Sequence, residues 1–221
     1  MDNLNEKNNF LYLAASLLIL LLVSPLTATI PEGFAYWIVK GVVTTTIIVC
    51  YLSLNFGRLW RRFTGALVVF MVVTSLLREL LDWGPATLLE LAVMLMFFLA
   101  AAYSAARRVL LKGEVDGNKI IGAIAIYLLL GLIWATLYLF ILELSPTAFN
   151  GIEYMHWADN FSTATYFSYV TLTTLGYGDI SPAEPLSRVL VYLEAMTGTF
   201  YMAVVIASLI SSRVGRRNVN N

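Results

Sequence analysis

The sequence has few of the residues from which enzymes and nucleic-acid-binding proteins build their sites. Of its 221 residues only 13% are charged, and 14 basic side chains balance 14 acidic ones, so binding to a polyanion has no electrostatic basis. It has one cysteine, Cys50, and one histidine, His156. A single chain therefore offers no disulfide framework and no thiolate metal site. We expect neither an enzyme nor a protein with a bound cofactor.

Long apolar runs are what the sequence has in abundance. Hydrophobic residues make up 59% of the chain, and its mean hydropathy is +0.78. The hydrocarbon core of a bilayer, about 30 Å thick, is crossed by about 20 apolar residues in a helix. The predicted fold is therefore an all-α membrane protein with six transmembrane helices. The six runs cover residues 10–30, 34–56, 63–81, 83–106, 120–144 and 186–212.

The first run has a second interpretation, as a cleaved secretory signal. Its apolar part is followed by small residues at 27–29, which is typical of a cleavage site. Before it, however, Asp2 and Glu6 offset the charge of Lys7, whereas a signal begins with net positive charge. We therefore favour six retained spans.

Basic residues predict the orientation of the spans. They lie between spans two and three, between four and five, and after six, whereas the opposite loops carry mainly acidic residues. The positive-inside rule places the basic loops, and with them both termini, in the cytoplasm of a multi-pass protein of the cell membrane. These residues are Arg58, Arg61, Arg62, Arg107, Arg108, Lys112, Lys119, Arg213, Arg216 and Arg217.

The segment 158–179, between the fifth and sixth runs, is too polar to span and is predicted to enter and leave the membrane by the outer face. A row of backbone carbonyls can replace the water shell of a cation. Such a row requires a backbone that alternates between left- and right-handed conformations, and Gly176 and Gly178 permit the positive φ this demands. We expect a hydroxyl contribution from Thr174, bracing by Tyr177, and hydrogen bonds from Asp179 at the outer end.

The nine residues 171–179 resemble the signature of the potassium channel family, in particular its six-span prokaryotic-type members with one pore loop per subunit. The resemblance implies a K⁺-selective channel subunit that forms a homotetramer in the lipid bilayer for passive K⁺ conduction. It also implies a voltage-sensor-like four-helix domain over 1–112 and a pore domain over 113–221. In this family K⁺ is bound by filter carbonyls, here those of Thr174, Leu175, Gly176 and Tyr177, with Gly178 completing the selectivity filter.

The resemblance assigns residues 158–173 to a pore helix, for which Asp159 or Asn160 is a suitable N-cap. Many relatives have a pair of tryptophans where this chain has aromatic residues of other kinds. Some relatives also have a glutamate that pairs with the filter aspartate, and here that glutamate is absent. The filter support implied by the resemblance thus consists of Asp179, Thr171, Tyr166, Phe167 and Val170.

In the last span, Gly198 falls 20 residues after Gly178 and matches the inner-helix glycine of the family. A glycine there serves either as a hinge or for close packing, since it weakens a helix by about 1 kcal/mol relative to alanine. The same match places four residues at 3, 4, 4 spacing along the ion path. These four are Thr199, Met202, Ile206 and Ile210. Ile206 and Ile210 either form a hydrophobic constriction of the ion path or pack between helices.

Charges are scarce inside the predicted spans. The fourth span, 83–106, contains no arginine, so steep voltage gating by arginines crossing the field is not expected. Lys40 and Glu90 lie within spans, and we predict that they pair with each other or with Arg78 and Glu79. In the last span Glu194 either bonds to the pore helix or stays protonated, and we expect a structural role for it.

Two other functions remain to be weighed against a K⁺-selective pore. One is a cation channel of poor selectivity, which the intact Gly176, Tyr177, Gly178 and Asp179 disfavour. The other is a membrane enzyme or a transporter. An enzyme would need clustered nucleophiles, carboxylates or histidines, and a transporter often has paired broken helices in two repeats. The sequence shows one re-entrant segment and no such cluster.

Overall fold

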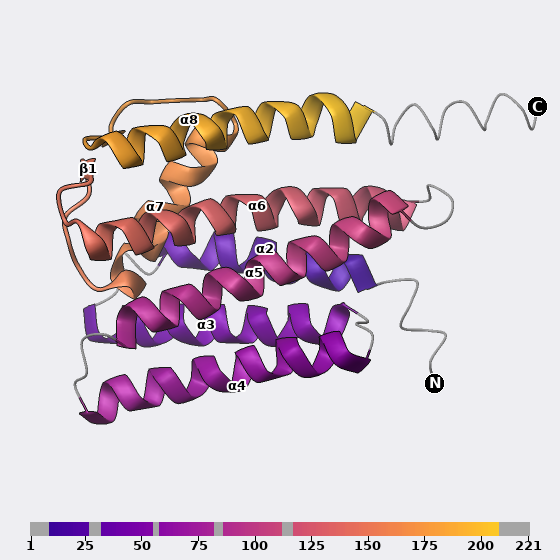
Figure 1. Ribbon diagram of the computed structural model, residues 1–221, viewed down its shortest axis with the longest axis horizontal. Helices are drawn as coiled ribbons and strands as arrows, with labels where there is room; N and C mark the ends of the chain where they lie inside the picture. Colours follow the sequence, from indigo (N-terminus) through magenta and orange to yellow (C-terminus); the bar gives the residue numbers. More distant parts are fainter. Residues whose placement is uncertain (1–8, 27–31, 55–57, 82–85, 112–116, 208–221) are drawn as a thin grey trace, which may run out of the picture.

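The computed structural model describes residues 9–26, 32–54, 58–81, 86–111 and 117–207. Among the described residues six helices run roughly side by side, and a seventh, α7, is inclined between two of them (Figure 1). The six are α2 (Asn9–Leu26), α3 (Glu32–Ser53), α4 (Arg58–Leu81), α5 (Ala86–Leu111), α6 (Gly117–Leu144) and α8 (Pro185–Phe200). The inclined helix α7 covers Trp157–Leu172, and α8 continues into a π-helical turn, η2 (Tyr201–Ile206).

Four helices among the described residues are long and apolar enough to cross a membrane. They are α2, α5 over Ala86–Val109, α6, and α8 extended to Val205. Among the side chains that the structure describes in α3 and α4, the apolar stretches Trp37–Ser53 and Arg62–Ser75 are shorter than this length. Six membrane crossings therefore stay a prediction. Among the described residues, four of the six helices meet the criterion of length and composition.

Helix α6 lies at the centre of the molecule, packed against α5, α2 and α7. It is apolar on all sides, as expected of a helix surrounded by others. The larger hydrophobic core includes Leu13 of α2, Phe97 of α5 and Leu129 of α6. This core joins the N-terminal helices to the C-terminal ones, so the predicted parts 1–112 and 113–221 pack directly on each other.

A short two-stranded sheet fixes the path of the chain around α7. Strand β1 (Phe149–Asn150) comes before α7, and β2 (Ser181–Pro182) comes after it. The strands pair antiparallel, with Phe149 opposite Pro182. The chain therefore leaves the end of α6, descends through α7, and returns to the end from which it started, where α8 begins (Figure 1). This path has the shape of a re-entrant loop.

Candidate functional site

Helix α7 begins one residue earlier than predicted, and its N-cap is neither Asp159 nor Asn160. The cap is His156, whose Nδ1 accepts a hydrogen bond from the Ala158 amide at 3.2 Å. The Asn160 side chain instead donates to the Glu153 carbonyl at 2.8 Å, and Asp159 lies in the first turn. The capping prediction was wrong because an imidazole nitrogen can accept the same bond as the oxygens that usually cap helices.

The segment after α7 has the alternating backbone that a row of carbonyls requires. Positive φ angles occur at every second position, 60° at Thr174, 59° at Gly176 and 82° at Gly178. Space around the two glycines is open, so conformation rather than crowding requires glycine there. Positive φ at Thr174, a β-branched residue, was not predicted and is a strained conformation of the kind that clusters at functional sites.

Hydrogen bonds fix the direction in which these peptides point. The amides of Leu175 and Gly176 both donate to the Val170 carbonyl of α7, at 2.9 and 3.3 Å. Both peptide bonds are trans, and in a trans peptide the C=O points opposite to the N–H. The carbonyls of Thr174 and Leu175 therefore point away from α7, toward the exposed side of the segment.

The outer end of the segment is held by α7 and by the turn after β1. Tyr166 Oη donates to Asp179 Oδ2 at 2.8 Å. Gly151, at φ 82°, lies so close to the Asp179 carbonyl that a Cβ there would collide with it. Sequence reasoning named Tyr166 and Asp179 as filter support but missed Gly151, for which a glycine just after a predicted span was the available signal.

The other predicted support residues lie on the buried side of α7. The Phe167 ring packs between those of Tyr138 and Phe149, with centroids 5.0 and 5.6 Å away. Val170 and Thr171 are buried, and the Thr171 carbonyl accepts the Thr174 amide at 2.9 Å. Val170 thus acts through its backbone, because its carbonyl anchors the two amides described above.

Glu184, just before α8, joins the end of α6 to the start of α8. Its Oε1 accepts hydrogen bonds from Ser145 Oγ at 2.5 Å and Thr147 Oγ1 at 2.9 Å. These hydroxyl donors, chiefly Ser145, lower the pKa of the Glu184 carboxyl. Its own amide donates to Ser187 Oγ at 3.1 Å. This clamp was not predicted.

Beside residues 174–178, the predicted filter and called the filter segment from here on, lies a hollow of ≈ 600 Å³. Two of the four side chains predicted to line the ion path, Thr199 and Met202, line it. The Ile206 side chain and all of Ile210 lie outside what the structure describes. The other lining residues are Tyr127, Leu172, Thr173, Thr174, Gly198 and Ala203.

Gly198 is where α8 comes closest to α7. A Cβ on Gly198 would collide with the Leu172 carbonyl oxygen, which also accepts a hydrogen bond from Tyr127 Oη at 3.3 Å. Two roles were left open for Gly198, a hinge and close packing. The nearby Leu172 carbonyl gives a reason for close packing. The helix nevertheless changes register a few residues later, at the π-helical turn η2, whose Tyr201 Oη donates to the Ala123 carbonyl of α6 at 2.6 Å.

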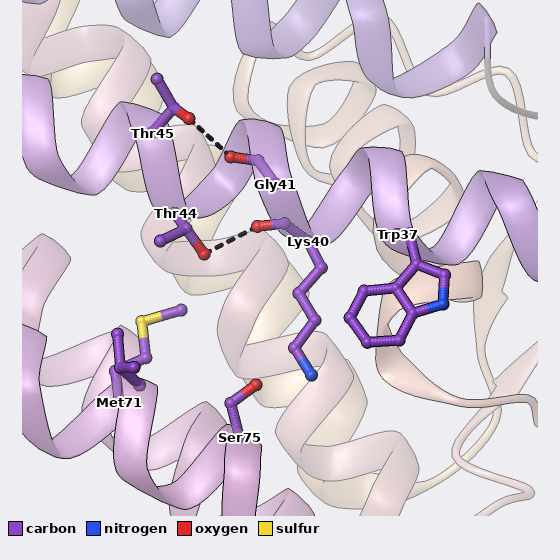
Figure 2. A pocket seen from close by; sticks show the side chains of 8 residues that line it. Trp37, Lys40, Gly41, Thr44, Thr45, Met71 and Ser75 are labelled. Carbon is purple, nitrogen blue, oxygen red and sulfur yellow. Dashed lines mark hydrogen bonds between the residues drawn. The ribbon is translucent and has the colours of Figure 1, made fainter. Parts of the chain in front are cut away.

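Lys40 and Glu90, the charges within the spans, each have a described contact with an aromatic side chain. Lys40 is buried on α3, beside a pocket of ≈ 400 Å³ between α3 and α4, and its Nζ is 5.6 Å from the centroid of the Trp37 ring (Figure 2). Glu90 of α5 accepts a hydrogen bond from the indole Nε1 of Trp157, the first residue of α7, at 3.1 Å. The predicted pair of Lys40 and Glu90 stays a prediction, and the bond to α7 was not foreseen.

Glu194 is fully buried between α8, α7 and α6. Its carboxyl contacts Ser168 Oγ of α7 at 2.5 Å and accepts a hydrogen bond from Tyr138 Oη of α6. Of the two alternatives considered for Glu194, bonding to the pore helix is therefore present in the structure.

One face of the molecule leaves apolar side chains uncovered beside the filter segment. Leu175 and Tyr177 are 56% and 67% exposed. Large apolar side chains of α8 and η2 continue this face, and we call them together the α8 face. They are Leu186, Val189, Tyr192, Leu193, Met196, Phe200, Met202 and Val204.

Comparisons with known proteins agree with the C-terminal part of this arrangement. Residues 124–212 match a family described as Ion channel. The inward rectifier potassium channel Kirbac3.1 of Paramagnetospirillum magnetotacticum is 46% identical over 57 residues, which are 26% of this chain and 19% of that protein. The chain thus matches about a fifth of the length of this relative. No solved structure gives a significant match.

These matches and the apolar helices support a membrane location and a protein that is not an enzyme. The C-terminal part of the chain, from α6 to the end of α8, is accordingly similar to ion channels, with a potassium channel among its relatives.

Proposed function

We propose that this chain is one subunit of a homotetrameric, K⁺-selective channel for passive conduction. The observation that carries the proposal is the filter segment, where positive φ recurs at every second residue and two amides are bound to Val170. Carbonyls that point away from α7 can take the place of water around K⁺. The ions would be held by the carbonyls of Thr174, Leu175, Gly176 and Tyr177.

The geometry of the filter segment and the exposed α8 face support an assembly of several copies. One strand of carbonyls cannot encircle an ion, so several chains have to present theirs to a common axis. In one chain the filter segment and the α8 face lie side by side and uncovered. An assembly that turns both inward covers the apolar side chains and brings the carbonyls together. The number four comes from the family resemblance.

The orientation proposed from basic residues is compatible with the helix arrangement. The first described residue of α2 and the last of η2 lie at the same end of the molecule, opposite β1 and β2 (Figure 1). We place that end in the cytoplasm and the filter segment toward the exterior. The C-terminal end of α7 then points at the hollow, where the negative end of its dipole favours a cation.

The deciding experiment is ion flux through the full chain reconstituted in lipid vesicles. We expect the reversal potential in mixed K⁺ and Na⁺ to follow the K⁺ gradient. Gly176→Ala should lower flux by about five- to thirtyfold, because alanine at φ 59° is strained by about 1–2 kcal/mol. The matched control is Gly41→Ala, since a Cβ at Gly41 in α3 meets nothing within 4 Å.

A reversal potential that ignores the K⁺ gradient, with cations still passing, would identify a poorly selective cation channel instead. Equal loss of flux in the Gly41→Ala and Gly176→Ala proteins would show that conduction does not depend on the filter segment. Native mass spectrometry of the same samples should give a mass of four chains.

A further inference from the structure

The carboxyl of Glu194 lies where α6, α7 and α8 meet. Its two oxygens, two hydroxyl oxygens and one backbone carbonyl oxygen are linked by contacts within hydrogen-bond distance. Glu194 and Ser168 are fully buried, and Tyr138 is 1% exposed. Ser168 Oγ lies 2.5 Å from Glu194 Oε1 and 2.7 Å from the Gly131 carbonyl oxygen of α6. Tyr138 Oη donates to Glu194 Oε2. Three acceptor oxygens thus face two hydroxyl groups.

Counting hydrogens decides the charge of this carboxyl. Each hydroxyl has one hydrogen to donate. The hydrogen of Tyr138 goes to Oε2, which leaves the hydrogen of Ser168 for two acceptors, Oε1 and the Gly131 carbonyl. If Glu194 were ionised, one of these two pairs would be in contact with no hydrogen between its oxygens, and two oxygens this close repel each other.

One further hydrogen on Oε1 satisfies every group. The carboxylic O–H of Glu194 then donates to Ser168 Oγ, and the Ser168 O–H donates to the Gly131 carbonyl. Tyr138 still donates to Oε2. We infer that Glu194 is a neutral carboxylic acid at neutral pH, and that its proton completes a chain of hydrogen bonds from α8 through α7 to α6.

The groups that face Glu194 from neighbouring helices offer no charge to balance a carboxylate. From α6 they are Tyr138 and Tyr127, and from α7 they are Ser168 and Tyr169. Tyr127 donates to the Leu172 carbonyl and Tyr169 to the Leu128 carbonyl at 2.6 Å. Among the described residues no cation bonds the Glu194 carboxyl. An unpaired buried carboxylate is costly, and costlier within a membrane.

This proton is close to the anchor of the filter segment. Ser168 precedes by two residues Val170, whose carbonyl binds the amides of Leu175 and Gly176. Loss of the proton would bring an anion against Ser168 and break the bond of Ser168 either to Glu194 or to Gly131. The geometry therefore makes Glu194 a positioning residue, whose deprotonation at alkaline pH lowers conduction. That last step rests on the proposed function of residues 174–178.

The protonation state is tested without ion flux. Infrared difference spectra of the full chain in lipid vesicles, parent protein minus Glu194→Gln, should show the carbonyl stretch of a protonated carboxyl at pH 7. The band should give way to a carboxylate band as the pH rises to about 10. A carboxylate band at pH 7 would overturn the inference, whatever the channel conducts.

The consequence is tested by K⁺ flux as a function of pH. We expect flux of the parent protein to fall by about tenfold between about pH 7 and about pH 10, as for loss of one buried hydrogen bond. Glu194→Gln should conduct and lose this pH dependence, because its amide N–H₂ donates to Ser168 and its carbonyl accepts from Tyr138. The control Glu153→Gln changes an exposed carboxyl and should keep the parent profile.

A second variant keeps the test decisive if Glu194→Gln fails to assemble. Tyr138→Phe removes the donor to Oε2, and because a hydrogen bond donated to the carboxyl favours its ionised form, flux should begin to fall at a higher pH than in the parent. An unchanged profile in either variant would overturn the inference about Glu194. Absence of K⁺ flux in the parent at every pH would instead refute the proposed function and leave the infrared result standing.

Discussion

Helices α6 and α8 are both apolar and both touch α7, yet their surroundings differ. In the most apolar stretch of α6, 56% of the residues are buried inside the chain, against 11% in that of α8. Helix α6 is enclosed by α2, α5 and α7, whereas α8 contacts α7 on one side and has the α8 face on the other. The helices of a single chain therefore surround α6, whereas they leave most of the surface of α8 uncovered.

The largest effect, on folding stability, is expected at the contact between α8 and α7 of the same chain. Gly198→Ala places a methyl group against the Leu172 carbonyl, and because that obstacle is backbone it cannot move aside cheaply. We expect a loss of about 3 kcal/mol in folding free energy, typical of overpacking at a tight contact. Thermal unfolding in detergent measures it. Gly41→Ala is again the control, and equal stability of the two variants would contradict the close contact.

The next largest effect is expected on the free side of α8. Phe200→Ala truncates a side chain that is 62% exposed in one chain but should be buried between subunits. We expect assembly to weaken by about 1–2 kcal/mol per subunit with the single chain still folded. Native mass spectrometry at falling protein concentration measures this. The control is Leu22→Ala on α2, 67% exposed, and equal weakening by both would mean that the α8 face is not the interface.

A smaller effect is expected at the outer end of the filter segment. Tyr166→Phe removes the hydrogen bond to Asp179 and leaves the ring. We expect the conducting state to lose about 1 kcal/mol, or about fivefold in its population. Single-channel recording measures open probability, with Tyr154→Phe as a control on an exposed tyrosine outside α7. Identical open times in both variants would show that the bond does not support the filter.

The smallest effect is expected from the clamp between α6 and α8. The hydroxyls of Ser145 and Thr147 lower the pKa of Glu184 in the folded state, so they favour its ionised form. The stabilisation is therefore full above the ordinary carboxyl pKa of 4.5 and is lost as the pH falls below that value. Thermal unfolding at pH 7 and at a pH well below 4.5 should show this loss in the parent and not in Ser145→Ala combined with Thr147→Ala. An equal loss of stability in the parent and the double variant between the two pH values would refute this prediction.

The filter segment was the most predictable part, because its chemistry depends on backbone conformation that particular residues permit. Glycine at 176 and 178 has the expected positive φ. Thr174 was assigned to the filter without its positive φ, since nothing in a threonine indicates a strained backbone. Six helix positions were predicted from apolar length alone, and the helices lie close to them. Their ends shifted by a few residues because caps such as Glu184, before α8, depend on local geometry.

Contacts between distant segments were the least predictable. The bond of Trp157 to Glu90 joins residues 67 positions apart, and no periodic pattern relates them. Glu90 was recognised as a costly charge that needs a partner, but the sequence did not single out the neutral indole N–H of Trp157 as one. Gly131 and Gly151 were also missed, since their value lies in the approach of Tyr169 and Asp179 from elsewhere in the chain.

The strand pair β1–β2 has a mechanical consequence for α8. It pins the first turn of α8, together with Glu184 and the bond from Ser187 Oγ to the Ala148 carbonyl at 2.8 Å. From this fixed support α8 and η2 project over 22 residues, the 16 of one and the 6 of the other, or about 33 Å. A free rod of this length tilted by about 5° would carry its far end about 3 Å sideways. The bonds of Glu194 to Ser168 and of Tyr201 to the Ala123 carbonyl tie α8 and η2 to α7 and α6, so a tilt of this size would have to break these contacts first.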